Sequence, residues 1–166
     1  DFEVASRLSY FLWSSMPDEE LLQIAEKGRL LKGRNLAKQL QRMLEDPKSN
    51  RFVQRFTEQW LDLGALDRVA INPQFYPNFN ERAIPDMRRE TEAFFAEILR
   101  NDLSALNFLD SDFSMLNERL AKHYGISGVV GTSMQRTPLP SDSKRGGLIT
   151  QGSMLVGNST GEDSHP

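Results

Sequence analysis

Apolar residues recur at intervals of three and four along most of the first 125 residues of this chain. In the opening segment Val4, Leu8, Phe11 and Leu12 follow this interval, which places them on one face of a helix. No segment shows a convincing alternation of apolar and polar residues, the pattern of a half-buried strand. The sequence therefore predicts an all-α fold, an irregular helical bundle of six to seven helices with a Gly/Ser/Pro-rich C-terminal tail.

Glycine and proline residues divide the helical pattern into separate helices. Gly28 follows the second apolar run and Gly125 follows the last, and both stand where a left-handed residue commonly ends a helix. Pro47 stops the third run because proline cannot continue a helix. After the opening helix, further helices are expected over residues 15–27, 35–46, 49–63, 80–100, 105–109 and 113–124.

Two segments depart from this pattern. Residues 65–79 combine two prolines with several aromatic residues, which predicts an irregular connector whose apolar side chains pack back onto the helices. The competing interpretation is an exposed aromatic strip that binds a ligand. After Ile126 the chain holds seven of its eleven glycines. We therefore expect a helical domain over residues 1–140 and an irregular tail over residues 141–166.

Charge and composition exclude several classes of function. The formal net charge of −3 argues against nucleic acid as a main partner, because phosphate binding requires a basic surface. The chain has no cysteine, so it cannot hold a thiolate metal site, an iron–sulfur cluster or a covalently attached c-type haem. No apolar run approaches the length needed to span a bilayer. The first residues do not resemble a signal peptide, which indicates a cytosolic protein or an internal piece of an exported one.

The helices offer few candidates for catalysis. His123 falls in the last turn of the helix predicted over residues 113–124, where a histidine commonly contacts free carbonyl groups. Glu90 and Glu97 are seven residues apart and share one side of the helix predicted over residues 80–100. Paired carboxylates can perform acid–base chemistry when they are desolvated. On an amphipathic helix such residues usually form the solvated face, and that is the expectation here.

The polar tail holds the remaining candidates. Residues 157–161 match the G-x-S-x-G pattern, and Asp163 and His165 follow in the order of a hydrolase triad. That motif requires a sharp turn between a strand and a helix, and no strand is predicted before it. Glu162, Asp163 and His165 are weak candidates for metal ligands or acid–base groups, and a disordered chain end is the simpler interpretation.

Several strings in the first 140 residues resemble a known family, the fourth planctomycete-specific domain of unknown function. The strings are ASRLSYFLWS (5–14), MPD (16–18), QWL (59–61), RETE (89–92), FF (94–95), LNERLA (116–121) and HYGI (123–126). The family occurs in large exported proteins of planctomycetes and related bacteria. The resemblance implies a periplasmic or extracellular location, and it supplies no catalytic residues.

The end of the chain resembles the opening of another domain, the third planctomycete cytochrome-associated one. The strings are RGGL (145–148) and GEDSHP (161–166). The resemblance implies that residues 141–166 begin a following domain, truncated at Pro166. Parents of this family typically carry a c-type haem module elsewhere, so the resemblance implies no cofactor in this chain and haem in another part of the parent protein. Neighbouring domains of the parent are the implied partners.

Two functional hypotheses follow. The first is a non-catalytic interaction or scaffold module of a larger exported, haem-linked protein. The second is part of an oxidoreductase active site that neighbouring domains complete, with Glu162, Asp163 and His165 as ligands or acid–base groups. The sequence leaves open whether the parent is an enzyme.

Overall fold

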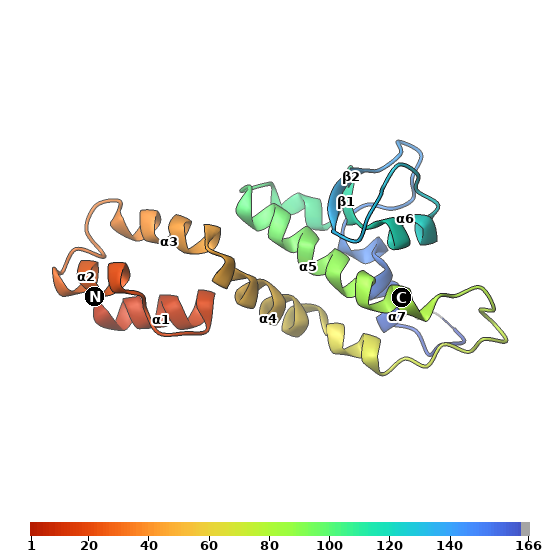
Figure 1. The fold of residues 1–166 in the computed structure, drawn as a ribbon, viewed down its shortest axis with the longest axis horizontal. Coiled ribbons are helices and arrows are strands. Elements are labelled where there is room, and N and C mark those ends of the chain that lie inside the picture. The colour runs from red at the N-terminus through yellow and green to blue at the C-terminus, as the bar shows by residue number, and fades with distance from the viewer. Residues whose placement is uncertain (164–166) are drawn as a thin grey trace. The chain divides into compact units, whose positions relative to one another are not determined.

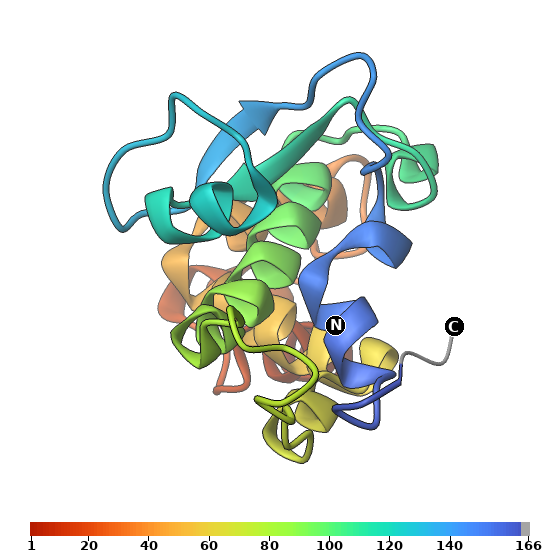
Figure 2. The ribbon, with the colours of Figure 1, turned by 90° about the vertical axis from the view of Figure 1, so that its right-hand side faces the viewer.

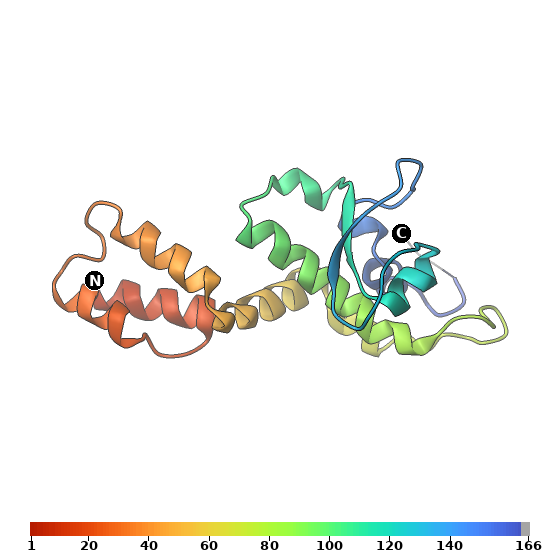
Figure 3. The same cartoon turned by 45° about the horizontal axis from the view of Figure 1, so that its top comes forward.

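The computed structural model describes residues 1–163, which form two compact units (Figures 1 and 3). The first unit runs from Asp1 to Phe56, and the second begins at Thr57. The boundary lies within one helix, so that α4 contributes its first residues to one unit and its last to the other. None of the helices in residues 1–163 combines the length and the apolar character needed to cross a membrane.

The first unit is entirely helical. Its core includes the fully buried Trp13, whose indole nitrogen donates a hydrogen bond of 2.9 Å to the carbonyl of Met43. Asp18 caps the second helix by accepting from the backbone N–H of Leu21, and it also receives two hydrogen bonds from Arg42. Its elements are α1 (Phe2–Trp13), α2 (Glu19–Glu26), α3 (Asn35–Glu45), a 3₁₀ turn (Pro47–Ser49) and the start of α4 (Asn50–Leu61).

The second unit is built around the long helix α5 (Ile84–Arg100). Figure 2 shows α5 with a pair of strands and α6 on one side and α7 on the other. Phe94 on α5 is fully buried and packs against the ring of Phe113. The other elements are β1 (Phe113–Leu116), α6 (Glu118–Tyr124), β2 (Gln135–Pro138), α7 (Gly152–Gly157) and 3₁₀ turns at Leu63–Asp67, Glu81–Ala83, Ala105–Phe108 and Leu148–Thr150.

The two strands correct the all-α prediction, although the fold is mostly helical. The helix expected over residues 113–124 begins only at Glu118, because the Asn117 side chain accepts a hydrogen bond from the N–H of Leu120 and so caps it there. The residues before it form β1, which pairs antiparallel with β2, Phe113 lying opposite Pro138. Phe113 and Leu116 are both buried, three residues apart, which imitates helical spacing.

Residues 145–163 are folded into the second unit. Leu148 is buried against Phe94 and Phe113, and α7 contacts α5. Gly161 is also buried, and its carbonyl accepts a hydrogen bond from the N–H of Asn72 in the connector. The division predicted at residue 140 stays a prediction, because compactness alone does not say which residues belong to a following domain.

Candidate functional site

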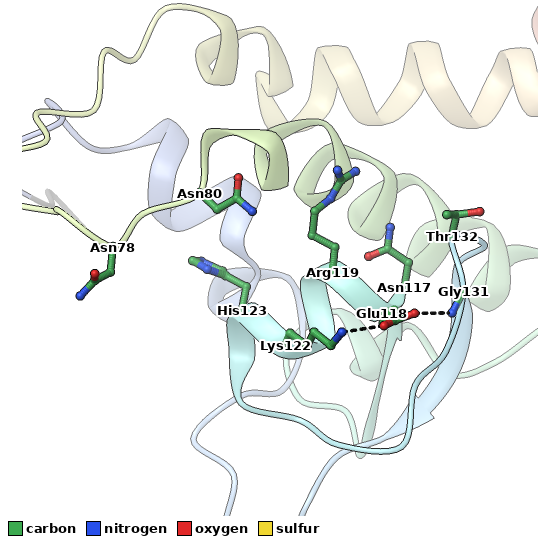
Figure 4. Close-up of a pocket in the computed structure, with 9 residues that line it drawn as sticks. All are labelled: Asn78, Asn80, Asn117, Glu118, Arg119, Lys122, His123, Gly131 and Thr132. Carbon is green, nitrogen blue, oxygen red and sulfur yellow. Dashed lines mark hydrogen bonds and ion pairs between the residues drawn. The ribbon is translucent and has the colours of Figure 1, made fainter.

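A polar pocket of about 550 Å³ lies beside α6 in the second unit (Figure 4). Its size is within the range of small-molecule sites. Arg119, Lys122 and His123 of α6 line it, facing the connector before α5 and the loop between α6 and β2. The other lining residues are Asn78, Asn80, Asn117, Glu118, Gly131 and Thr132.

Arg119 is held by a buried carboxylate. Asp86 on α5 is 1% exposed and accepts a hydrogen bond of 2.5 Å from Nε of Arg119. Arg89 also contacts Asp86, at 3.4 Å. Burial raises the pKa of Asp86, but Arg119, Asn117 and Arg89 outweigh it, so the pKa lies below its usual value. The arginine therefore tethers α6 to α5 as well as lining the pocket.

The second cation of the pocket is also paired. Lys122 lies 2.6 Å from Glu118 one turn before it on α6. The other carboxylate oxygen of Glu118 accepts from the N–H of Gly131 (Figure 4). The Glu118 N–H in turn donates to the Gly131 carbonyl. The charges of this rim are thus balanced, and they fix the loop that follows α6 rather than leaving a cation free for a ligand.

His123 does not cap α6. Gly125 ends the helix in the left-handed conformation, with φ of 71°. The imidazole instead lies edge-on to Phe79 of the connector, with ring centroids 5.5 Å apart. Burial and the nearby Arg145 lower the pKa of His123, so the ring is neutral at pH 7. Its place at the pocket rim allows hydrogen bonding to a polar ligand.

The buried Asp86 gives a prediction for stability. We expect Asp86→Asn to lower the free energy of unfolding of the second unit by about 2 kcal/mol at pH 7, because the hydrogen bonds to two arginines lose their charge. Since the pKa of Asp86 is lowered, its contribution is present above its unfolded value and is lost as the pH falls through its folded value. The difference between the two proteins should therefore shrink in acid.

Urea titration followed by the fluorescence of Trp60, in a Trp13→Phe background, would measure this loss in the second unit. Trp13 and Trp60 are the two tryptophans of the chain. Glu118→Gln is the matched control, because it removes a carboxylate that pairs with a cation at the surface. An equal loss for both variants would contradict the special role of the buried Asp86.

A second polar cluster lies inside the unit, around Glu90. This α5 residue is 1% exposed. The Ser114 hydroxyl of β1 donates to one carboxylate oxygen at 2.7 Å, and the Tyr124 hydroxyl of α6 donates to the other at 2.6 Å. The Tyr124 oxygen in turn accepts from the N–H of Gly152 at 2.9 Å. Three elements and the start of α7 therefore meet at one carboxyl group.

Burial dominates the protonation of this group. It raises the pKa of Glu90 to about 7, although Tyr124, Ser114 and Arg145 oppose the rise. Burial and the adjacent Glu90 also raise the pKa of Tyr124, which therefore stays protonated. The expectation of a solvated Glu90 is thus wrong: this carboxyl is buried and titrates near neutrality.

The segment from Arg145 to Ser153 closes over Glu90. The Arg145 guanidinium lies 3.6 Å from the centroid of the Tyr124 ring and donates to the carbonyl of Thr150. Together with Glu90, these residues border a cavity of only about 10 Å³. Such a cavity admits no substrate, so the cluster is an internal network in this conformation.

A neighbouring set of buried hydroxyls and amides joins α5 to the same segment. Thr91 Oγ1 lies 2.6 Å from Gln151 Oε1 and 2.5 Å from the hydroxyl of Ser153. Because Thr91 has one hydroxyl proton, it donates to Gln151 and accepts from Ser153. All three residues are buried. Polar groups therefore hold the segment against α5 on both sides of Gly152.

Glu162 and Asp163 line neither the pocket beside α6 nor the cavity at Glu90. Glu162 is exposed, and its carboxylate accepts a hydrogen bond of 2.8 Å from the Asn72 amide. Asp163 is exposed and its backbone bonds to Thr160. His165 falls outside the described residues, so the set of Glu162, Asp163 and His165 stays a prediction. Within residues 1–163, no three His, Cys, Asp or Glu residues are grouped as a metal site would require.

Sequence reasoning missed the Glu90 cluster, but a signal for it was present. Glu90 follows Met87 by three residues and precedes Phe94 by four, so it lies on the apolar stripe of α5. A carboxylate on such a stripe is either buried with partners or destabilising.

A family model matches residues 1–126 of the chain, from the first helix to the residue after the glycine that ends α6. No curated protein and no solved structure matches the chain significantly. The match covers Glu90, Asp86 and Tyr124, whereas β2, Arg145 and α7 lie beyond it. Since the matched residues make up most of the sequence, the chain belongs to the PSD4 family of proteins of unknown function (DUF1592).

Proposed function

We propose that this chain is a non-catalytic interaction module that anchors the domain following it in a larger exported protein. The observation that carries the proposal is the burial of Gly147, Leu148 and residues 151–153 within the second unit, where they pack on α5, β1 and α6. These residues lie beyond the family match, yet they bond to Tyr124 and Thr91 within it. The residues matched by the family model thus bury part of the segment that follows them. This arrangement is suited to holding the next domain in a fixed place.

The resemblance of residues 145–148 and 161–166 to the third planctomycete cytochrome-associated domain supports the identity of the anchored partner. In this proposal the parent protein acts in the periplasm or outside the cell, and its haem is bound by another part of the chain. The pairing of Arg119 with Asp86 and of Lys122 with Glu118 supports a structural role for the polar pocket.

The anchoring can be tested by cutting the loop after α6. We would insert a protease site between Ser127 and Gly128, which are both exposed, and cleave the folded chain. Because contacts on β1, α5 and α6 hold the C-terminal piece, we expect both pieces to elute together in size-exclusion chromatography. Separation of the pieces under native conditions would contradict the proposal. As a reference, the chain is cleaved while unfolded in urea, which shows where the separated pieces elute.

The alternative function, a share in an oxidoreductase site, rests on Glu162, Asp163 and His165. Elemental analysis and a visible spectrum of the purified chain, with and without added haem, would distinguish it. The scaffold proposal expects neither a stoichiometric metal nor a haem-binding spectrum. A metal or haem signal that disappears in His165→Ala, or in His123→Ala, would favour the redox site instead.

A further inference from the structure

Residues 145–153, which cover Glu90, are linked through Tyr124 to the Glu90 carboxyl, a group that can gain or lose a proton. The Glu90 carboxyl bonds to Tyr124, and Tyr124 accepts the N–H of Gly152 at the start of α7. A Cβ on Gly152 would lie 2.6 Å from the Tyr124 hydroxyl and 2.8 Å from Cγ of Met87. The absence of a side chain therefore lets the backbone approach the tyrosine closely.

Glu90 has no cation bonded directly to it among the described residues. The nearby Arg145 is held over the Tyr124 ring and bonds to Thr150. An ionised carboxylate in this place is shielded from water, and the two hydroxyl donors, the nearby Arg145 and the Gly152 N–H offset that loss only in part. Protonation removes this penalty, and opening of the segment removes it as well, because water then reaches the carboxylate.

We propose that Glu90, Ser114 and Tyr124 form a proton-controlled latch that holds residues 145–153 against α5. The latch is closed when Glu90 is protonated and opens more readily when Glu90 is ionised. It is a property of this chain's own residues and does not depend on which domain follows. In the parent protein, such a latch would make the docking of that chain segment sensitive to the pH of its surroundings.

The groups around Glu90 determine whether the latch opens more or less readily as the pH rises. β1 contributes the neutral Ser114, α7 contributes a backbone N–H, and the covering segment contributes Arg145, which is charged throughout. From α6 come Tyr124 and, behind it, His123. The pKa of Glu90 is raised from 4.5 to about 7, so closure binds a proton between these pH values and the latch loosens as the pH rises. His123 has a lowered pKa and would act in the opposite direction.

Hydrogen exchange of the intact chain, measured by mass spectrometry on peptides covering residues 145–157, tests the latch. Protection factors corrected for the intrinsic pH dependence of exchange give the opening equilibrium. We expect the opening constant to rise at least tenfold between pH 5 and pH 7.5 and then to level off, with a limit on the order of 10²-fold if opening fully hydrates Glu90. Peptides from α2 in the first unit provide an internal reference.

Three variants separate the latch from other causes. Glu90→Gln should abolish the pH dependence, and His123→Gln should retain it. Ser114→Ala removes one donor to the carboxylate, and the Ser114 hydroxyl bonds to Glu90 rather than to residues 145–153, so this variant should move the midpoint to higher pH. A purely structural cluster would not shift its midpoint in this way.

The proposal is overturned if the wild-type protection does not depend on pH, or if Glu90→Gln keeps the wild-type dependence. Circular dichroism establishes whether Glu90→Gln folds. If it does not, the carboxyl carbon shift of Glu90 in the wild type, titrated by NMR, takes its place. A midpoint near the ordinary glutamate value would then contradict the latch, whereas a midpoint near neutrality that matches the exchange data would support it.

Discussion

Replacing Gly147 with alanine is expected to lower the free energy of unfolding of the second unit by about 4 kcal/mol. Gly147 has φ of 69° and ψ of −178°, a conformation that is almost restricted to glycine. A Cβ there would lie 2.5 Å from the carbonyl oxygen of Leu109 and 2.7 Å from that of Phe108. These atoms belong to the backbone, so they cannot move aside as a flexible side chain would.

The same urea titration, followed through Trp60, measures this loss. Gly125→Ala is the matched control, because Gly125 also has a positive φ, of 71°, but no atom lies within 4 Å of its Cβ position. It should cost only about 1 kcal/mol, the penalty for a left-handed residue with a side chain. If both variants lost the same free energy, the close packing of Gly147 against Leu109 would have no energetic consequence.

The helices could be predicted because their signals are local. The glycine and proline residues that bound them act within one or two turns, so Gly125 ends α6 as expected and Pro47 follows α3. The helix expected over residues 15–27 begins only at Glu19, because Asp18 caps it there. Such signals require no knowledge of tertiary partners.

The strands could not be predicted because their pairing is distant. Phe113 and Leu116 have the spacing of a helical face, and nothing near them indicates the partner at Gln135–Pro138. The burial of Glu90 was missed for a similar reason. Its surroundings come from Ser114, Tyr124 and Gly152, which lie between 24 and 62 residues away in sequence. From the sequence alone, only the position of Glu90 on the apolar stripe of α5 could be recognised.

Raising the pH from 4.5 to 8 is expected to lower the free energy of unfolding of the second unit by about 3 kcal/mol through Glu90 alone. The folded protein holds the Glu90 proton up to a pKa of about 7, compared with 4.5 for an ordinary glutamate. Between these values the folded state binds more protons than the unfolded state, so stability falls as the pH rises. Above about pH 8 both states are largely ionised and little further stability is lost.

Other groups titrate over the same range, so the contribution of Glu90 is the difference between the wild type and Glu90→Gln. Urea titrations at half-unit steps of pH should give a steeper fall for the wild type between pH 5 and pH 7. Glu97→Gln removes a carboxylate from the same helix, one that pairs with Arg136 at 3.3 Å outside the network, and it should keep the wild-type slope. If Glu90→Gln and Glu97→Gln behaved alike, burial of Glu90 would not govern the pH dependence. If only Glu90→Gln removed the fall of the free energy of unfolding with pH, the buried Glu90 carboxyl would be the group that determines the pH range in which the second unit is most stable.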